Sequence, residues 1–219
     1  MKTILFGATG MVGQGVLREC LADAVVTQVL VIGRSPIGQT HPKLREIIHK
    51  NFEDFSLLEN QLSGYDACFF CLGISSAGMS EKDYRHITYD FTLAAAKTLA
   101  KLNPQMTFIY VSGAGTDSTE KGRMMWARVK GATENALLGL PFKAAYMFRP
   151  GAIQPLDGIV PKNKWLGGLL VIFGPLFPIM KWLFPRHVTT TRKIGQAMIK
   201  AARDGFSKKW VESWDINQL

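Results

Sequence analysis

Cysteine is scarce in this sequence of 219 residues, and what is absent already excludes several classes of protein. The three cysteines, Cys20, Cys68 and Cys71, are too few and odd in number for the disulfide framework of a small secreted domain. The N-terminus runs directly into glycines, without the cationic region and cleavage site of a secretory signal peptide. We therefore expect a reducing, cytoplasmic location.

Metal-binding patterns are also missing. The four histidines are scattered, and no carboxylate stands at ligand spacing from any of them. Cys68 and Cys71 have the spacing of a redox or metal pair, but they fall inside a predicted strand. Positions three apart on a strand point to opposite faces, so these thiols cannot readily share an ion or form a disulfide. No metal site is predicted.

The remaining composition is that of one globular domain. Hydrophobic residues make up 47% of the chain and charged residues 20%, which excludes intrinsic disorder. The 21 glycines have no fixed period, which excludes a collagen-like chain. Because no linker, repeat or low-complexity tract interrupts the sequence, residues 1–219 are expected to form a single domain.

Short apolar runs alternate with longer helical patterns. The runs predict strands over residues 3–6, 28–32, 45–50, 67–72, 107–111, 144–148 and near 210–214. Helices are predicted over residues 13–22, 55–61, 84–102 and 122–138. The strands show little polar alternation, as in a parallel sheet covered on both faces. The predicted fold is a doubly wound α/β Rossmann domain with a small, helical, hydrophobic lobe over residues 155–190 on the substrate side.

Three glycines, Gly7, Gly10 and Gly13, join the first strand to the first helix. The first glycine permits a tight turn, the second lets the backbone approach a pyrophosphate, and the third allows close packing of helix on strand. The helix N-terminus then offers unpaired N–H groups and the positive end of its dipole to phosphates. The turn therefore predicts dinucleotide-binding residues at Gly7, Thr9, Gly10, Met11, Val12 and Gly13.

The end of the second strand indicates which dinucleotide is bound. An acidic residue there would bind the ribose 2′-hydroxyl of NAD, whereas an arginine accommodates the 2′-phosphate of NADP. The sequence has no acid at this place and continues with Arg34 and Ser35, a guanidinium fork and a hydroxyl donor. NADP is therefore predicted in preference to NAD.

Several further segments extend the pattern, namely residues 69–73, 111–115, 129–131 and 148–151. Together with the glycine turn and Arg34, they resemble an atypical short-chain dehydrogenase/reductase, in the Tat-interacting-protein-like and NAD(P)H-binding, epimerase-like branch. The likeness covers residues 1–155 and, more loosely, 188–199. It implies the Rossmann fold and additional cofactor contacts at Asn51, Phe52, Leu72, Gly73, Pro150 and Gly151.

The same resemblance implies an active site. The family uses a serine, a tyrosine and a lysine four residues after the tyrosine, and here Ser112 and Lys130 match the serine and the lysine. In such a site the lysine lowers the pKa of the phenol and holds the nicotinamide ribose, the tyrosine passes the proton, and the serine holds the substrate oxygen. Trp126 stands four residues before Lys130, in the place of the tyrosine. An indole N–H donates a hydrogen bond but does not titrate usefully.

Two functions therefore stay open. The first is an NADP-dependent oxidoreductase acting on an apolar carbonyl-type substrate, with its proton supplied by Tyr84, Tyr89 or water. The second is a non-catalytic NADPH-binding sensor or assembly factor, because Trp126 replaces the usual acid. A homodimer through the long helices is compatible with either.

The C-terminal quarter of the chain is basic and apolar. Residues 162–219 hold 10 Lys and Arg against 3 Asp and Glu, whereas residues 1–161 hold 16 against 14. An apolar run over residues 165–184 lies inside the basic part and is interrupted by glycines and prolines. The run is compatible with packing on the core or a dimer partner, with peripheral contact to an acidic membrane and, least of all, with a span. No nucleic-acid-binding module is recognised, so nucleic acid is not expected as a partner.

Overall fold

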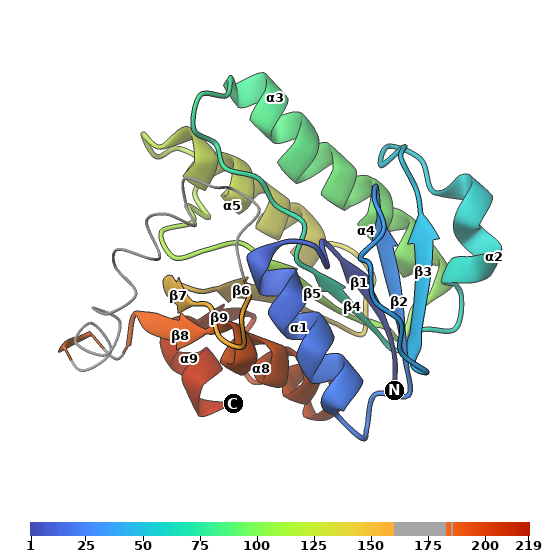
Figure 1. Cartoon of the computed structure of the whole chain (residues 1–219). Helices are drawn as coiled ribbons and strands as arrows, with labels where there is room; N and C mark the ends of the chain where they lie inside the picture. Colours follow the sequence, from blue (N-terminus) through green and yellow to red (C-terminus); the bar gives the residue numbers. More distant parts are fainter. Residues whose placement is uncertain (160–182, 185) are drawn as a thin grey trace.

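The computed structural model describes residues 1–159, 183–184 and 186–219. Its main sheet has seven strands in the order β3-β2-β1-β4-β5-β6-β9, and every pair of neighbours is parallel (Figure 1). The strands are β1 (Lys2–Phe6), β2 (Gln28–Gly33), β3 (Leu44–Ile48), β4 (Ala67–Phe70), β5 (Thr107–Val111), β6 (Ala144–Arg149) and β9 (Trp210–Glu212). The predicted doubly wound α/β class is confirmed.

Helices cover both faces of this sheet (Figure 1). One face is covered by α1 (Met11–Ala22), α8 (Thr191–Asp204) and α9 (Ser213–Gln218). The other face is covered by η1 (Ser56–Leu58), α2 (Glu59–Leu62), α3 (Glu81–Arg85), the π-helical turn η2 (His86–Asp90), α4 (Phe91–Leu102) and α5 (Met125–Leu138). This double cover explains the apolar strands, since both faces of each central strand are buried.

Alternate side chains of each strand enter the two core layers. In β1, Leu5 packs in the layer under α1 and α8, whereas Ile4 and Phe6 pack in the layer under α4 and α5. Cys68 and Cys71 are divided in the same way, with Cys68 in one layer and Cys71 packed against the other. Both are free thiols, and burial raises the pKa of each. Cys68 is a core residue and Cys71 is partly buried, and their placement in different layers keeps the two thiols from sharing an ion or a disulfide.

The C-terminal part of the chain completes the sheet and one of its layers. A small parallel sheet of β7 (Ala152–Gln154) and β8 (Val188–Thr190) leads into α8, whose first turn is capped by Thr190 through a 3.1 Å bond from Lys193 N to Oγ1. Neither β7, β8 nor α8 was predicted as an element. Most of the predicted lobe over 155–190, and nearly all of the apolar run over 165–184, lies outside the described residues. Within the part of the chain that is described, no helix has the length and apolar character needed to cross a bilayer.

Two glycines allow α1 and α8 to approach closely. A Cβ at Gly15 of α1 would lie 2.6 Å from the Thr191 Cβ and 2.8 Å from the Thr191 carbonyl oxygen. A Cβ at Gly195 of α8 would lie 3.2 Å from the Cα of Val16. The two helices therefore meet nearly backbone to backbone, and this contact holds the C-terminal segment onto the N-terminal half of the sheet.

Replacing Gly15 with alanine is expected to lower the free energy of unfolding by about 1–3 kcal/mol, because the added methyl overpacks this contact. The higher helix propensity of alanine stabilises the helix, but by less than the overpacking destabilises it. The control is Gly139→Ala at the end of α5, where φ is −86° and an added Cβ would lie 3.5 Å from the Ala136 oxygen. Urea unfolding followed by circular dichroism measures both variants. Equal stability of the two variants would contradict the close-contact interpretation.

Candidate functional site

The turn between β1 and α1 is built from backbone contacts that only glycine permits. Gly7 has a φ of +77°, and a Cβ there would lie 2.6 Å from the Leu72 nitrogen. A Cβ at Gly13 would lie 2.1 Å from the Gly7 oxygen, while the Gly10 N–H donates to that same oxygen at 2.9 Å. The glycine loop therefore packs directly on the backbone that follows β4. The first helical turn of α1, in turn, packs directly on the glycine loop.

The N-terminus of α1 is uncapped, an arrangement that suits an anion. The helix begins at Met11 after Gly10, no side chain caps it, and its first turn contains no acidic residue. The positive end of the helix dipole and the first N–H groups are thus left for a ligand. This is the arrangement that the glycine spacing predicted.

A pocket of about 460 Å³ opens at this place, where β1, β2 and β4 end. Nine of the predicted cofactor-binding residues line it: Gly7, Thr9, Gly10, Met11, Arg34, Ser35, Phe52, Leu72 and Gly73. Ile37, Ile74 and Ser75 also line it and were not predicted, because they lie in loops that carry no motif. The structure thus brings together segments that are far apart in the sequence.

Other predicted residues support this pocket or lie beside it. Val12 packs into the core layer beneath α1, and Gly13 packs on the Gly7 backbone. Asn51 is exposed and does not line the pocket; its side-chain oxygen accepts the Glu53 N–H at 3.1 Å. The next residue, Phe52, is buried and lines the pocket instead.

Arg34 and Ser35 lie at the exposed rim of the pocket, directly after β2. Among the described residues, no hydrogen bond or ion pair engages the Arg34 side chain. A guanidinium without a protein partner keeps all its donors for a ligand oxygen. The geometry is compatible with the predicted 2′-phosphate contact.

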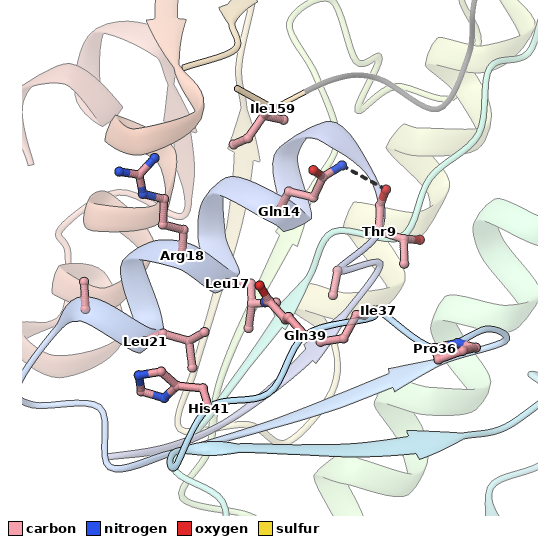
Figure 2. A pocket seen from close by; sticks show the side chains of 12 residues that line it. Thr9, Gln14, Leu17, Arg18, Leu21, Pro36, Ile37, Gln39, His41 and Ile159 are labelled. Carbon is pink, nitrogen blue, oxygen red and sulfur yellow. Dashed lines mark hydrogen bonds between the residues drawn. The ribbon is translucent and has the colours of Figure 1, made fainter. Parts of the chain in front are cut away.

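A second pocket, of about 640 Å³, lies on the other side of the glycine turn (Figure 2). It is bounded by one side of α1 and by the segment after β2, and its wall includes Leu17, Leu21 and His41. Figure 2 shows the Gln14 amide bonded to the Thr9 oxygen, at 3.1 Å, between this pocket and the turn. Of the predicted site residues only Thr9 lines this pocket, so the larger cavity is not the predicted cofactor site.

Ser112 directly follows β5, and Trp126 and Lys130 lie in the first two turns of α5. Lys130 Nζ donates a hydrogen bond to the Ser112 carbonyl oxygen. Trp126 lies one helical turn before Lys130, and its indole ring covers Gly115, where an added Cβ would lie 3.4 Å from the ring. Burial lowers the pKa of Lys130 to about 8, while the negative charge of Glu134 acts in the opposite direction. Lys130 therefore contacts Ser112 through the serine backbone, a contact that was not predicted from the sequence.

The Ser112 hydroxyl points into the protein. Its oxygen is 2.5 Å from Oε1 of Glu134 and 3.2 Å from the Phe148 carbonyl oxygen. The hydroxyl proton is therefore engaged by Glu134, and the side chain is buried. In this arrangement Ser112 does not present its proton to a substrate oxygen, which is the role that the resemblance implied.

Glu134 is the centre of a buried ionic network that sequence reasoning missed. It is fully buried, and Arg149 holds both of its carboxylate oxygens, with Nε 3.0 Å from Oε1. Arg149 also donates to the Ser118 hydroxyl at 2.6 Å and lies 3.8 Å from the Glu212 carboxylate. The only sequence signal was the position of Glu134, one helical turn after Lys130.

The remaining candidates are two residues after β6 and two tyrosines, and none of them lines the pocket at the glycine turn. The Pro150 oxygen accepts the Ala114 N–H at 2.9 Å, and a Cβ on Gly151 would lie 2.4 Å from the His187 oxygen, so neither lines the cofactor pocket. Tyr84 is buried, and burial raises its pKa. Tyr89 carries the Arg85 guanidinium over its ring at 4.0 Å. Within the described ranges no three His, Cys, Asp or Glu residues are grouped to hold a metal ion.

Glu134→Ala is expected to destabilise the fold by about 3–5 kcal/mol, since it leaves the Arg149 cation, whose side chain is only 13% exposed, without its carboxylate. Glu212→Ala is the control, because Glu212 is half exposed and 3.8 Å from the same guanidinium; its loss should cost less than about 1 kcal/mol. Thermal and urea unfolding measure both. A small effect of Glu134→Ala would mean that water or another group satisfies Arg149.

Known proteins resemble this chain along most of its length. The mitochondrial protein FMP52-1 of Scheffersomyces stipitis is 25% identical, covering 100% of this chain and 98% of the relative. The protein FMP52 of Eremothecium gossypii is 26% identical, covering 79% of this chain and 75% of the relative. The protein HTATIP2 of Rattus norvegicus is 26% identical, covering 69% and 62%. No protein-family model matches the chain.

The fungal relatives correct the expected cytoplasmic location. Several are named as mitochondrial proteins, including those of Scheffersomyces stipitis, Eremothecium gossypii and Chaetomium globosum. The prediction was wrong because it was drawn from the scarcity of cysteine. Unpaired thiols indicate a reducing compartment, and they do not distinguish the cytoplasm from another one.

Solved structures share the fold at low sequence identity. A short-chain dehydrogenase/reductase superfamily protein of Agrobacterium tumefaciens with bound NAD has a TM-score of 0.68 at 13% identity, covering 96% of this chain and 76% of that one. The UDP-glucose 4-epimerase of Thermotoga maritima has a TM-score of 0.65 at 13% identity, covering 93% and 74%. The resemblance predicted from the sequence is confirmed: the chain has the NAD(P)-binding Rossmann fold of the short-chain dehydrogenase/reductase and epimerase proteins.

Proposed function

We propose that this protein is an NADP-dependent oxidoreductase that reduces or oxidises an apolar carbonyl-type substrate. The observation that carries the proposal is the pocket at the glycine turn, where an uncapped helix N-terminus faces the exposed Arg34. NAD is bound by the Agrobacterium tumefaciens neighbour, whose fold is the same. The fold alone supports a dinucleotide, and the residues at the rim support the choice of NADP.

The residues present fit the cofactor in two places. The N–H groups at the start of α1 suit a pyrophosphate, and Arg34 with Ser35 suits a 2′-phosphate, since no carboxylate from the described residues lines this pocket. Phe52 and Leu72 supply apolar walls. Lys130 supplies a cationic donor that suits ribose hydroxyls, as the resemblance implies. The bound cofactor would supply a hydride donor or acceptor.

The chain's own contribution to proton transfer is unusual for this family. The indole N–H of Trp126 does not titrate usefully, so Trp126 cannot act as the acid. The Ser112 hydroxyl donates its hydrogen bond to Glu134. Tyr84 and Tyr89 are occupied elsewhere, in the core and under Arg85. Lys130, with its pKa lowered to about 8, is the titratable donor on the Trp126 side of α5. Because Lys130 is itself engaged by the Ser112 carbonyl oxygen, we assign the proton of the reaction to water.

The second candidate function is NADPH binding without turnover, as a sensor or assembly factor. Trp126 in place of a phenol and the inward Ser112 hydroxyl both favour it. Both functions require the cofactor pocket. They differ in whether a substrate beside Lys130 is reduced or oxidised. Binding and consumption of NADPH must therefore be measured separately.

Arg34→Ala should weaken NADPH binding by about 10- to 100-fold and leave NADH binding nearly unchanged, because only NADPH carries the 2′-phosphate. The control is Arg45→Ala, which removes an exposed arginine of β3 that does not line the pocket. Titration of protein fluorescence with each cofactor measures the dissociation constants. An equal loss for NADPH and NADH would overturn the assignment of Arg34.

Trp126→Tyr should raise NADPH consumption at least about tenfold over the wild type, since general acid catalysis is worth about 10²–10⁴-fold. Trp126→Phe is the control, because it changes the ring without adding a titratable hydroxyl. NADPH absorbance is followed with a panel of aldehydes, ketones and quinones. A wild type that binds NADPH but consumes none with any of them supports the sensor instead.

A further inference from the structure

The connection between β2 and β3 leaves one side of α1 uncovered. Parallel strands are usually joined through a helix, which covers the face of the sheet that it crosses. Here residues 34–43 pass from β2 to β3 without forming a helix. The cavity of about 640 Å³ lies in this place, between α1 and the connecting loop (Figure 2). It is called the α1 pocket below, and its size is typical of sites for small organic molecules.

The α1 pocket is held open by contacts of the connecting loop. The Ile37 N–H donates to Oε1 of Glu46 in β3 at 2.8 Å. The Lys43 ammonium group donates to the Leu21 and Asp23 carbonyl oxygens at 3.0 and 2.6 Å, at the C-terminal end of α1. These bonds tie the loop to the strand on one side and to the helix on the other. The protein's own contacts therefore fix the shape of the pocket.

One part of the pocket wall is apolar. Leu17 and Leu21 lie one helical turn apart on the same face of α1, and Ile37 of the loop lines the same pocket. Leu17 belongs to the core layer beneath α1, while Leu21 and Ile37 pack against that layer and are only partly buried. An apolar body in the pocket would remove the remaining surface of these two side chains from water.

Polar side chains lie along both sides of α1 in this pocket. Figure 2 shows the Arg18 guanidinium on one side of the helix and the Gln39 and His41 side chains on the other. His41 Nδ1 accepts the Lys43 N–H at 3.2 Å, so Nε2 carries the hydrogen of the neutral ring. The pocket thus offers N–H donors on both sides, which suit the acceptor oxygens of a ligand.

The charge of the pocket favours an anion. Nη1 of Arg18 lies 2.8 Å from the Asp157 carboxylate, and Nη2 of Arg192 lies 2.6 Å from the same carboxylate. Two guanidinium groups therefore share one negative charge, and the Arg18 side chain is 50% exposed. Among the described residues no aspartate or glutamate lines the pocket. An anionic group is thus matched to the Arg18 side of the pocket, and a cationic group is not.

The α1 pocket lies beside the cofactor pocket and shares Ala8, Thr9 and Ile37 with it. Its other lining residues do not line the cofactor pocket, so both can be occupied together. We propose that the α1 pocket binds an organic anion with an apolar body, of the class of alkyl carboxylates. The carboxylate lies at Arg18, and the alkyl chain lies on Leu21 and Ile37. This site is separate from the proposed oxidoreductase reaction and does not depend on it.

Calorimetric titration of the whole chain with octanoate tests this inference. Octanoate should bind at least about fivefold more tightly than octanol or octyltrimethylammonium, because only octanoate carries a negative charge for Arg18. Octanoate binding should persist when NADPH is present, since the two pockets are distinct. No saturable binding of octanoate, equal binding of the three compounds, or loss of octanoate binding in the presence of NADPH would overturn the proposal. The titration without NADPH is independent of the proposed function.

An arginine variant locates the anionic group. Arg18→Gln should weaken octanoate binding at least about fivefold and leave octanol binding nearly unchanged. The control is Arg203→Gln, which removes an arginine of similar exposure (44%) that is also paired with an aspartate and lies outside the pocket. An equal loss of octanoate binding in the two variants would contradict the assignment of Arg18.

A second pair of variants adds a charge instead of removing one. Ala22→Asp places a carboxylate at an exposed residue that lines the pocket, and it should weaken octanoate binding at least about threefold through repulsion. Ala24→Asp is the control, because it adds the same charge at an exposed residue just after α1 that does not line the pocket. Melting temperatures confirm that each variant is folded. Equal effects of the two substitutions would show that octanoate binds elsewhere.

Discussion

A buried carboxylate held by a guanidinium determines how the residues around Ser112 and Lys130 are arranged. Glu134 is fully buried in α5 and Arg149 ends β6, so their contact joins a helix to the sheet. Taking both charges out of water is costly, and only the paired geometry offsets that cost. The pair is therefore held in one arrangement. Ser112 is bound to the same carboxylate, and Lys130 in turn is bound to Ser112.

The glycine turn depends on a different constraint. There Gly7 and Gly13 let the turn, the helix and the end of β4 come together without side chains. Phosphates are recognised by N–H groups and a helix dipole, which need a backbone path and not particular side chains. This chain therefore combines a turn of the kind that suits a dinucleotide with Trp126 at the position that the resemblance to short-chain dehydrogenases/reductases assigns to a tyrosine.

The parallel sheet brings these two ends together. The carboxyl ends of all its strands lie at one side of the sheet, so the glycine turn after β1 and Ser112 after β5 lie on the same side of the molecule although they are about a hundred residues apart in the sequence.

The sequence by itself determined the main sheet, the glycine turn and the division of Cys68 and Cys71 between the two faces of the sheet. These features depend on local patterns: apolar runs covered on both faces, glycines spaced by three residues, and side chains that alternate along a strand. The strand predicted over 67–72 ends at Phe70; the Cys71 N–H still donates to the Phe6 oxygen at 3.0 Å, and the chain then passes close to Gly7.

Only the tertiary structure decided the direction of the Ser112 hydroxyl, the role of Glu134 and the packing of α8. Each depends on residues far apart in the chain: Glu134 meets Arg149, and Gly15 meets Thr191. No local periodicity encodes such a pair, because its partner is chosen by burial. In the sequence, Glu134 has the same appearance as a solvent-exposed charge of a helix. Only the fold buries it and places Arg149 beside it as the counter-ion.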